Sequence, residues 1–261
     1  MSFLGPVGSL IPVKCASQLT SSGGRSVSFQ DTLGKRKAFL GNVRAREWSV
    51  DIGLAKPAEL SGLRWLSENV NTPMVWYGPD AVVGNILSPA QADFAPGTHN
   101  GLEGPLVEVE PGVYVKSVLP DSGTSVAFPR SNGQRARVPV VVGREVTAAA
   151  WVRGANARVQ VVWWNADQQN VGSMSSPVSS GANFRRAHVS GVPPAGAVAL
   201  TCALYGSQVA GPSVTVSDRL LPYSPGRGAT NVIVHGLSDA VIRATDQQQL
   251  GSLSFTISEV G

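Results

Sequence analysis

The chain has 261 residues, which is enough for one large β domain or two domains of ordinary size. Charged residues make up only 15% of it, against about a quarter in an average soluble protein, which favours a surface that partners cover in part. The net charge is +4, but the basic residues are scattered apart from Lys35, Arg36 and Lys37. Proteins that bind nucleic acids usually carry a basic stripe with interleaved aromatic residues, so we expect no nucleic-acid partner.

The N-terminal stretch, MSFLGPVGSLIPV, is apolar but has no basic start, and Pro6 and Pro12 interrupt it. This stretch does not fit a signal peptide. A membrane span needs about 20 consecutive apolar residues, and no run in the chain is that long, so no membrane insertion is expected. We expect the apolar side chains of this stretch to be buried against a neighbouring chain. These assembly residues are Phe3, Leu4, Leu10, Ile11 and Val13.

Short strands are expected next in the first segment, which extends to about residue 95. Ser26–Phe29 alternates in polarity, and Ala38–Leu40 follows the basic cluster. Trp48, Val50 and Ile52 alternate with polar residues, which is the period of a half-buried strand.

One short helix is predicted after this strand. Pro57 suits the first turn of a helix, and Leu60, Leu63 and Leu66 then fall on one helical face. An apolar strand is expected at Met74–Tyr77. The residues that follow it predict a turn at 78–80 and an irregular stretch at 85–89.

The second segment, residues 96–225, consists of strand-like runs separated by turns. Their number, with no convincing helix among them, predicts a β-sandwich, and a jelly roll is the leading candidate. The expected strands are 113–118, 125–128, 137–142, 146–152, 158–164, 185–189, 197–204 and 214–220.

The third segment, residues 226–261, is too short to bury a core alone. Thr230–Val234 and Leu253–Val260 are expected as strands, with a helical or looped turn at Gly236–Arg243 between them. We therefore predict a mainly β chain in which 1–95 and 226–261 form one β domain with a short helix. The jelly-roll sandwich of 96–225 is inserted into that domain.

Few residues carry recognisable chemistry. The three histidines have no metal-ligand spacing, and no serine lies in a Gly-x-Ser-x-Gly motif. Glu108 and Glu110 would share a strand face, which serves a glycosidase only if both line a cleft. Cys15 and Cys202 are expected as free thiols, which suits synthesis in a reducing compartment. The sequence therefore predicts a protein that is not an enzyme and needs no cofactor.

The strand at 158–164 offers a candidate ligand face. Val159, Val161 and Trp163 lie on one side of it and are expected in the core. Arg158, Gln160 and Trp164 lie on the other side. A flat aromatic ring beside polar donors can stack on a sugar and hydrogen-bond its hydroxyls, so these three residues are the predicted glycan site. The alternative is a sheet surface covered by a loop or a neighbouring subunit.

Several of these motifs together resemble the N-terminal part of minor tail proteins, the distal tail-tip proteins of long-tailed, siphovirus-like phages of actinobacteria. The first segment carries an Arg-x-Trp-x-Val strand at 46–50, an Ala-x-Pro-x-x-Leu helix at 55–60 and an aromatic Pro-Asp-Ala turn at 76–81. An Asn-x-Leu-x-Pro stretch follows at 85–89, and the ending GSLSFTISEVG resembles the closing strand of those proteins. The middle segment is similar to carbohydrate-binding-module jelly rolls in AAAWVRGANARVQVVWWNADQQNVGS and VTVSDRLLPYSPG.

The resemblance implies a structural protein of the virion tail, made in the host cytoplasm. Its first and third segments would form a tail-attachment domain within a tail tip or baseplate. Its partners would be the tail tube, the tape measure, the tail-tip hub and further copies in a ring or trimer. Asp218 would join a structural calcium site, as an Asp in the last strand of such jelly rolls often does. The alternative function is a carbohydrate-binding module for a cell-wall glycan of the host envelope, and a glycan hydrolase is the third candidate.

Overall fold

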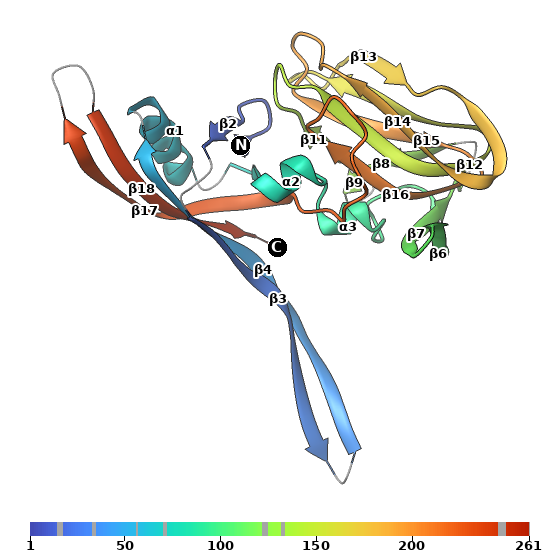
Figure 1. The fold of residues 1–261 in the computed structure, drawn as a ribbon, viewed down its shortest axis with the longest axis horizontal. Coiled ribbons are helices and arrows are strands. Elements are labelled where there is room, and N and C mark those ends of the chain that lie inside the picture. Colours follow the sequence, from blue (N-terminus) through green and yellow to red (C-terminus); the bar gives the residue numbers. More distant parts are fainter. Residues whose placement is uncertain are drawn as a thin grey trace. The chain divides into compact units, whose positions relative to one another are not determined.

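The computed structural model describes residues 1–260 except 15–17, 33–34, 56, 70–71, 122–124, 132–133 and 245–248 (Figure 1). It is mainly β with antiparallel sheets, which confirms the predicted fold class. The chain divides into two compact units. Unit 1 comprises Met1–Leu10 and Tyr77–Ala229, and unit 2 comprises Ile11–Trp76 and Thr230–Gly261. None of the described helices is long and apolar enough to cross a membrane.

Unit 1 holds most of the short strands and two short helices. Its strands are β1 (Ser2–Pro6), β6 (Leu102–Glu110), β7 (Val113–Leu119), β8 (Ser125–Phe128), β9 (Arg130–Ser131), β10 (Gln134–Arg135), β11 (Val138–Pro139), β12 (Val146–Trp164), β13 (Asn170–Ser175), β14 (Ser179–Gly191), β15 (Ala199–Tyr205) and β16 (Gln208–Thr215). Its helices are α2 (Pro79–Val83) and α3 (Pro89–Ala92).

Nine of the described strands of unit 1 form a sandwich of two sheets that share β12, whereas β1 belongs to the seven-stranded sheet and β9 pairs with β10. The first half of β12 pairs with β14 and β16, and β16 continues to β7 and β6. The second half pairs with β13 and β15, and β15 also pairs with β8 and β11. We call these the first sheet and the second sheet. Side chains from both fill the core between them, among them Val118, Val126, Val161 and Leu204.

The strand β12 passes from one sheet to the other through a bend at residues 153–157. Gly154 has φ 101° and Asn156 has φ 55°, and the pairing with β14 shifts register on both sides of Gly154. The sequence predicts two separate strands at 146–152 and 158–164, whereas the structure joins them. A bend built from positive-φ residues lets one strand serve two sheets, which a pattern of alternation alone does not distinguish from a loop.

A small apolar cluster lies on the outer face of the first sheet. Trp151, buried to 1% exposure, packs edge-on against Tyr223 with ring centroids 5.0 Å apart. The guanidinium of Arg186 lies over the same indole, 4.9 Å from the ring centroid. Tyr223 belongs to the irregular stretch 216–228, so the predicted strand at 214–220 is wrong beyond Thr215. The stretch leaves the sheet edge and covers the indole of Trp151.

The turn predicted at 78–80 is corrected in unit 1, and the irregular stretch predicted at 85–89 ends at Ser88. The residues expected as a turn at 78–80 open helix α2, with Gly78 as its N-cap and Pro79 in its first turn. The irregular stretch at 85–89 leads into α3. There Ser88 and Gln91 form a capping box: the Gln91 N–H donates to Ser88 Oγ, and the Ser88 N–H donates to Gln91 Oε1.

The side chain of Asn85 fixes the stretch 85–89 against the sandwich. It is fully buried, and its Nδ2 donates to the carbonyls of Pro212 and Ser224 at 3.2 Å. Its Oδ1 accepts from the N–H groups of Leu87 and Val214. One amide side chain thus satisfies four backbone groups that belong to three separate segments.

Unit 2 is built on long strands and one helix. Its elements are β2 (Ile11–Val13), β3 (Gln18–Thr32), β4 (Lys35–Ala55), α1 (Pro57–Glu68), β5 (Met74–Tyr77), β17 (Ala229–Ala244) and β18 (Gln249–Glu259), of which β5 and β17 begin or end in unit 1. The helix begins at Pro57 as predicted, and Leu63 and Leu66 are both 2% exposed. Leu253, Phe255 and Ile257 of β18 are also buried, which confirms the predicted alternation.

The sheet of unit 2 contains the order β5–β17–β18–β4–β3. The predicted turn at Gly236–Arg243 is wrong, because these residues lie within β17. Gly236 has φ 65°, and the pairing with β18 shifts register between His235 and Ser238. The glycine that reads as a turn in the sequence instead marks a β-bulge. The division between predicted domains at 95–96 and 225–226 stays a prediction.

The hairpin of β3 and β4 extends beyond the rest of this sheet (Figure 1). Strand β18 pairs with β4 only from Glu47 to Ala55. Strand β3 pairs with β4 from the Gln18–Asp51 pair to the Thr32–Lys35 pair. Among the described residues, positions 35–44 of β4 therefore pair with β3 alone. We call β3 together with residues 35–44 of β4 the hairpin arm.

Candidate functional site

The outer face of the second sheet carries the predicted glycan residues. Val159, Val161 and Trp163 are at most 3% exposed and point into the core, as predicted. Arg158 and Trp164 are half-buried on the opposite face, beside residues of β15. The alternation along residues 158–164 therefore separates the core face of the strand from its outer face, as predicted.

Thr201 and Arg137 help to hold Trp164 in place. Its Nε1 donates a hydrogen bond to Thr201 Oγ1 at 2.9 Å. The guanidinium of Arg137 lies over its ring, 4.7 Å from the centroid. The indole is thus fixed in orientation and part of its surface is already covered. Arg137 and Thr201 come from other parts of the chain, so the pattern of β12 alone could not reveal them.

Arg158 and Gln160 are also engaged within the chain. The guanidinium of Arg158 lies 3.7 Å from the centroid of the Tyr205 ring, and its Nη1 donates to the Asn156 carbonyl. The Tyr205 hydroxyl donates to Gln160 Oε1 at 3.0 Å. Tyr205 is a member of this face that the sequence analysis missed, although the register of β15 against β12 places it opposite Arg158. The two predicted donors are therefore fixed around Tyr205.

A shallow hollow lies on the same side of the second sheet. Its volume is about 60 Å³, far below the several hundred Å³ of a typical small-molecule pocket. It is lined by Ala127, Phe128, Pro129, Val162, Thr201, Cys202 and Ala203. Since Thr201 also holds Trp164, the indole stands beside this hollow. The face can offer a rigid aromatic surface but cannot enclose a ligand.

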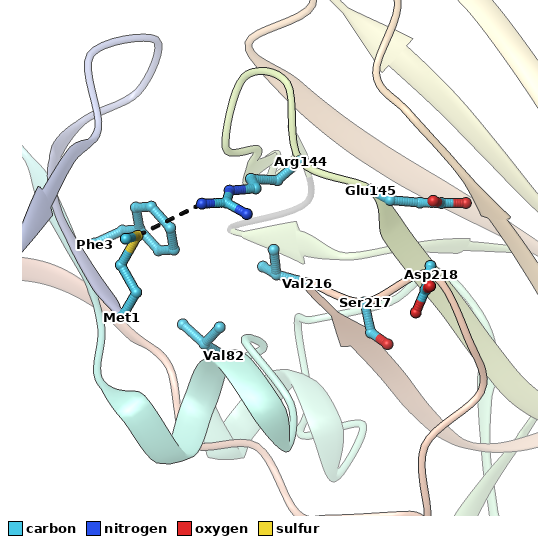
Figure 2. A pocket seen from close by; sticks show the side chains of 8 residues that line it. All are labelled: Met1, Phe3, Val82, Arg144, Glu145, Val216, Ser217 and Asp218. Atoms are coloured by element: carbon cyan, nitrogen blue, oxygen red, sulfur yellow. Dashed lines mark hydrogen bonds between the residues drawn. The ribbon is translucent and has the colours of Figure 1, made fainter.

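Asp218 lies outside the last strand of the sandwich, in the lining of a different pocket of unit 1 (Figure 2). This pocket has a volume of about 290 Å³. Glu145 and Ser217 also line it, while Arg144 points toward Met1, with its Nη2 3.8 Å from the sulfur. In the described part of the chain, no three His, Cys, Asp or Glu side chains are grouped to hold a metal. The calcium site at Asp218 remains a proposal, and Glu145 and Ser217 are the other residues with side-chain oxygens in the lining of this pocket.

Glu108 and Glu110 do not form a pair of free carboxylates. Both lie in β6, which the sequence analysis did not expect, and the register shifts between them. Glu108 Oε1 accepts from the Gly112 N–H at 2.9 Å, and Glu110 Oε1 accepts from Trp151 Nε1 at 3.3 Å. Each carboxylate thus has its own structural partner.

The predicted assembly residues differ in their surroundings. Phe3, Leu4 and Val13 are at most 4% exposed within the chain itself. Leu10 and Ile11 are half-buried and keep accessible surface. Ile11 and Val13 also line a hollow of about 170 Å³ in unit 2, together with Ile52 and Leu63.

No family model matches the sequence, and no curated protein matches it either. Among solved structures, the enzymatically active domain of tailspike protein 4 of bacteriophage CBA120 is similar at 13% identity and a TM-score of 0.38. That match covers 51% of this chain, which spans only 21% of the tailspike chain. The infectious bursal disease virus VP2 subviral particle is similar at 10% identity and a TM-score of 0.25, over 98% of this chain and 83% of VP2. Similarities this low assign no function.

Proposed function

We propose that the chain is a structural, non-enzymatic component of a phage tail tip or baseplate. It would join the tail tube to more distal parts, in contact with the tape measure, the tail-tip hub and further copies of itself in a ring or trimer. The observation that carries the proposal is the hairpin arm, whose backbone pairs only with itself between residues 24 and 44 among the described residues.

A two-stranded ribbon of this length needs a partner. An isolated hairpin is marginally stable in water at best, because it buries little apolar surface and its outer backbone groups stay unpaired. A solitary enzyme or lectin has no use for such an extension, whereas a subunit of an assembly can bury it against a neighbour. The kind of assembly is suggested by the motifs that resemble those of phage tail proteins. These motifs lie at 46–50, 55–60, 76–81 and 85–89.

The proposal is tested in particles. Antibodies raised against the purified chain should label one end of the tail in electron micrographs of virions from the host that carries the gene. A chain shortened by joining residue 23 to residue 45 through a two-residue turn should keep the sandwich but fail to enter particles. Absence of the full-length chain from purified virions would refute the tail-component function.

Glycan recognition is the second candidate, and the fixed position of Trp164 favours it. An aromatic ring that is already immobilised loses little conformational entropy when a sugar stacks on it. Trp164→Ala should weaken binding to purified host envelope by about tenfold. Thr201→Val keeps the ring and removes only its hydrogen-bond acceptor, so it should retain most of the binding. If both variants bind as well as the unmodified chain, this face is not the glycan site.

A further inference from the structure

The positive charge of the chain gathers in the hairpin arm. Residues 18–44 contain five basic residues and one acidic residue, a net charge of +4 that equals the net charge of the whole chain. The rest of the molecule is therefore neutral in sum. The six charged residues are Arg25, Asp31, Lys35, Arg36, Lys37 and Arg44.

The pairing of β3 with β4 explains how scattered residues become one basic element. Arg25 pairs with Val43, next to Arg44, and Asp31 pairs with Arg36 near the tip of the hairpin. In the sequence these residues extend over positions 25–44 and give no basic stripe. In the folded chain they lie along a single two-stranded ribbon.

The arm also has two free backbone edges. Strand β3 is the last strand of its sheet, and between residues 35 and 44 the other edge of β4 pairs with no strand among the described residues. Each edge presents N–H and C=O groups that another extended polypeptide can pair with by strand addition. A nucleic acid could neutralise the positive charge of the arm, but its backbone cannot form the hydrogen bonds of a β ladder.

We propose that the hairpin arm binds an acidic polypeptide segment in extended conformation, supplied by a different protein of the assembly. Two arms of this chain would bring like charges together along the ribbon, which disfavours arm-to-arm pairing between copies. The neutral remainder of the chain offers no matching excess of negative charge. This inference rests on the proposed assembly function, because that function is the reason why the arm needs a partner.

Binding of a defined probe to the purified full-length chain tests this inference apart from any particle. The probe is a labelled peptide of alternating Glu and Thr of about 12 residues, the length of a strand that can cover the arm. We expect it to bind with a strong dependence on salt, and a Lys–Thr peptide of the same length not to bind. Backbone amides within 18–32 and 35–44 should become protected from hydrogen exchange when the Glu–Thr peptide is bound.

Matched charge reversals locate the binding. Lys35→Glu with Lys37→Glu changes the net charge by the same amount as Arg185→Glu with Arg219→Glu, two exposed residues of unit 1. The arm variant should lose at least about tenfold in affinity and the control variant should lose little. Equal losses in both variants, or no binding of the Glu–Thr peptide, would overturn the proposal.

Three other results would also overturn it. Peptide binding without protection of the arm amides would mean that charge alone acts and no strand is added. Tighter binding of a short random DNA duplex, lost in the same arm variant, would assign the arm to nucleic acid. An arm-dependent dimer in sedimentation, with no peptide bound, would make a second copy the partner. A chain that is found in virions but does not bind the peptide would leave the tail function standing and refute only this inference.

Discussion

Arg46 and Glu259 form a two-point ion pair at the position where β4 leaves the sheet of unit 2. Arg46 Nε donates to Glu259 Oε2 at 2.9 Å, and its Nη2 donates to Oε1 at 2.8 Å. The guanidinium also lies over the Trp48 ring, 5.1 Å from its centroid. The last backbone pair between β18 and β4 is Ser258–Glu47, so this contact closes the sheet where the hairpin arm begins.

Glu259→Gln should loosen the base of the arm. The side chains are only about a quarter exposed, and the paired geometry suits a charge-assisted bond, so we expect a loss of about 1 kcal/mol in local stability. Hydrogen exchange of the amides in 46–50 and 255–259 measures it. The control is Asp239→Asn, which removes the more exposed pair with Arg64 and should cost under about 0.5 kcal/mol. Equal effects of the two variants would contradict a special role for Arg46.

Gly154→Ala should destabilise the bend of β12. A Cβ at this position would lie 2.6 Å from the backbone nitrogen of Ser207, and φ 101° is strained for any other residue. We expect a loss of about 2 kcal/mol in the unfolding free energy of the sandwich, measured by urea denaturation. Gly181 is the pairing partner of Gly154 and has open space around its Cα, so Gly181→Ala is a matched control. It should change stability by less than about 0.5 kcal/mol.

Substitutions around Trp164 should separate stability from binding. Trp164→Ala removes the contact with Arg137 and the bond to Thr201, and we expect it to cost about 2 kcal/mol in thermal or urea unfolding. Thr201→Val removes the acceptor alone and should cost about 1 kcal/mol. A Trp164→Ala variant as stable as the unmodified chain would mean that the ring is not packed as described.

The stability of unit 1 should fall as pH rises through the alkaline range. Burial raises the pKa of the Cys202 thiol from 9.0 to about 12. Burial, and then the charge of Asp93, raise the pKa of Tyr223 from 10.0 to about 12, against the opposing effect of Arg186. The unfolded chain loses these protons first, so the stabilisation is complete below pH 9 and declines between about pH 9 and pH 12.

Urea unfolding at a series of pH values measures this decline. Tyr223→Phe removes one of the titrating groups and should make the decline shallower between pH 10 and pH 12. A flat profile up to pH 12 in the unmodified chain would contradict the burial of both groups.

Local patterns in the sequence predicted the elements whose side chains alternate or repeat. The buried set Trp48, Val50 and Ile52 and the helix that begins at Pro57 follow from period and from the fixed φ of proline. The strand Met74–Tyr77 was predicted with its bounds. The core side of β12 was predicted too, because side chains of a strand point to opposite faces in turn.

Local patterns were less reliable around glycine and proline. Gly236 was predicted in a turn and Gly154 between two strands, and the structure uses them for a bulge and a bend within long strands. Pro79 was predicted in a turn and Pro89 at the end of an irregular stretch, and both open short helices. A glycine or proline fixes what the backbone can do locally, but the strand or helix around it is decided by what it packs against.

By itself, the sequence determined the mainly β class, the buried faces and the absence of any catalytic motif that could be recognised by spacing. Tertiary structure alone decided the partners of the outer-face residues: Arg137 and Thr201 meet Trp164, and Tyr205 meets Arg158, from strands distant in the chain. It also placed the five basic residues of 18–44 along one two-stranded ribbon. Such contacts depend on the register between strands, a long-range property that no local pattern of side chains contains.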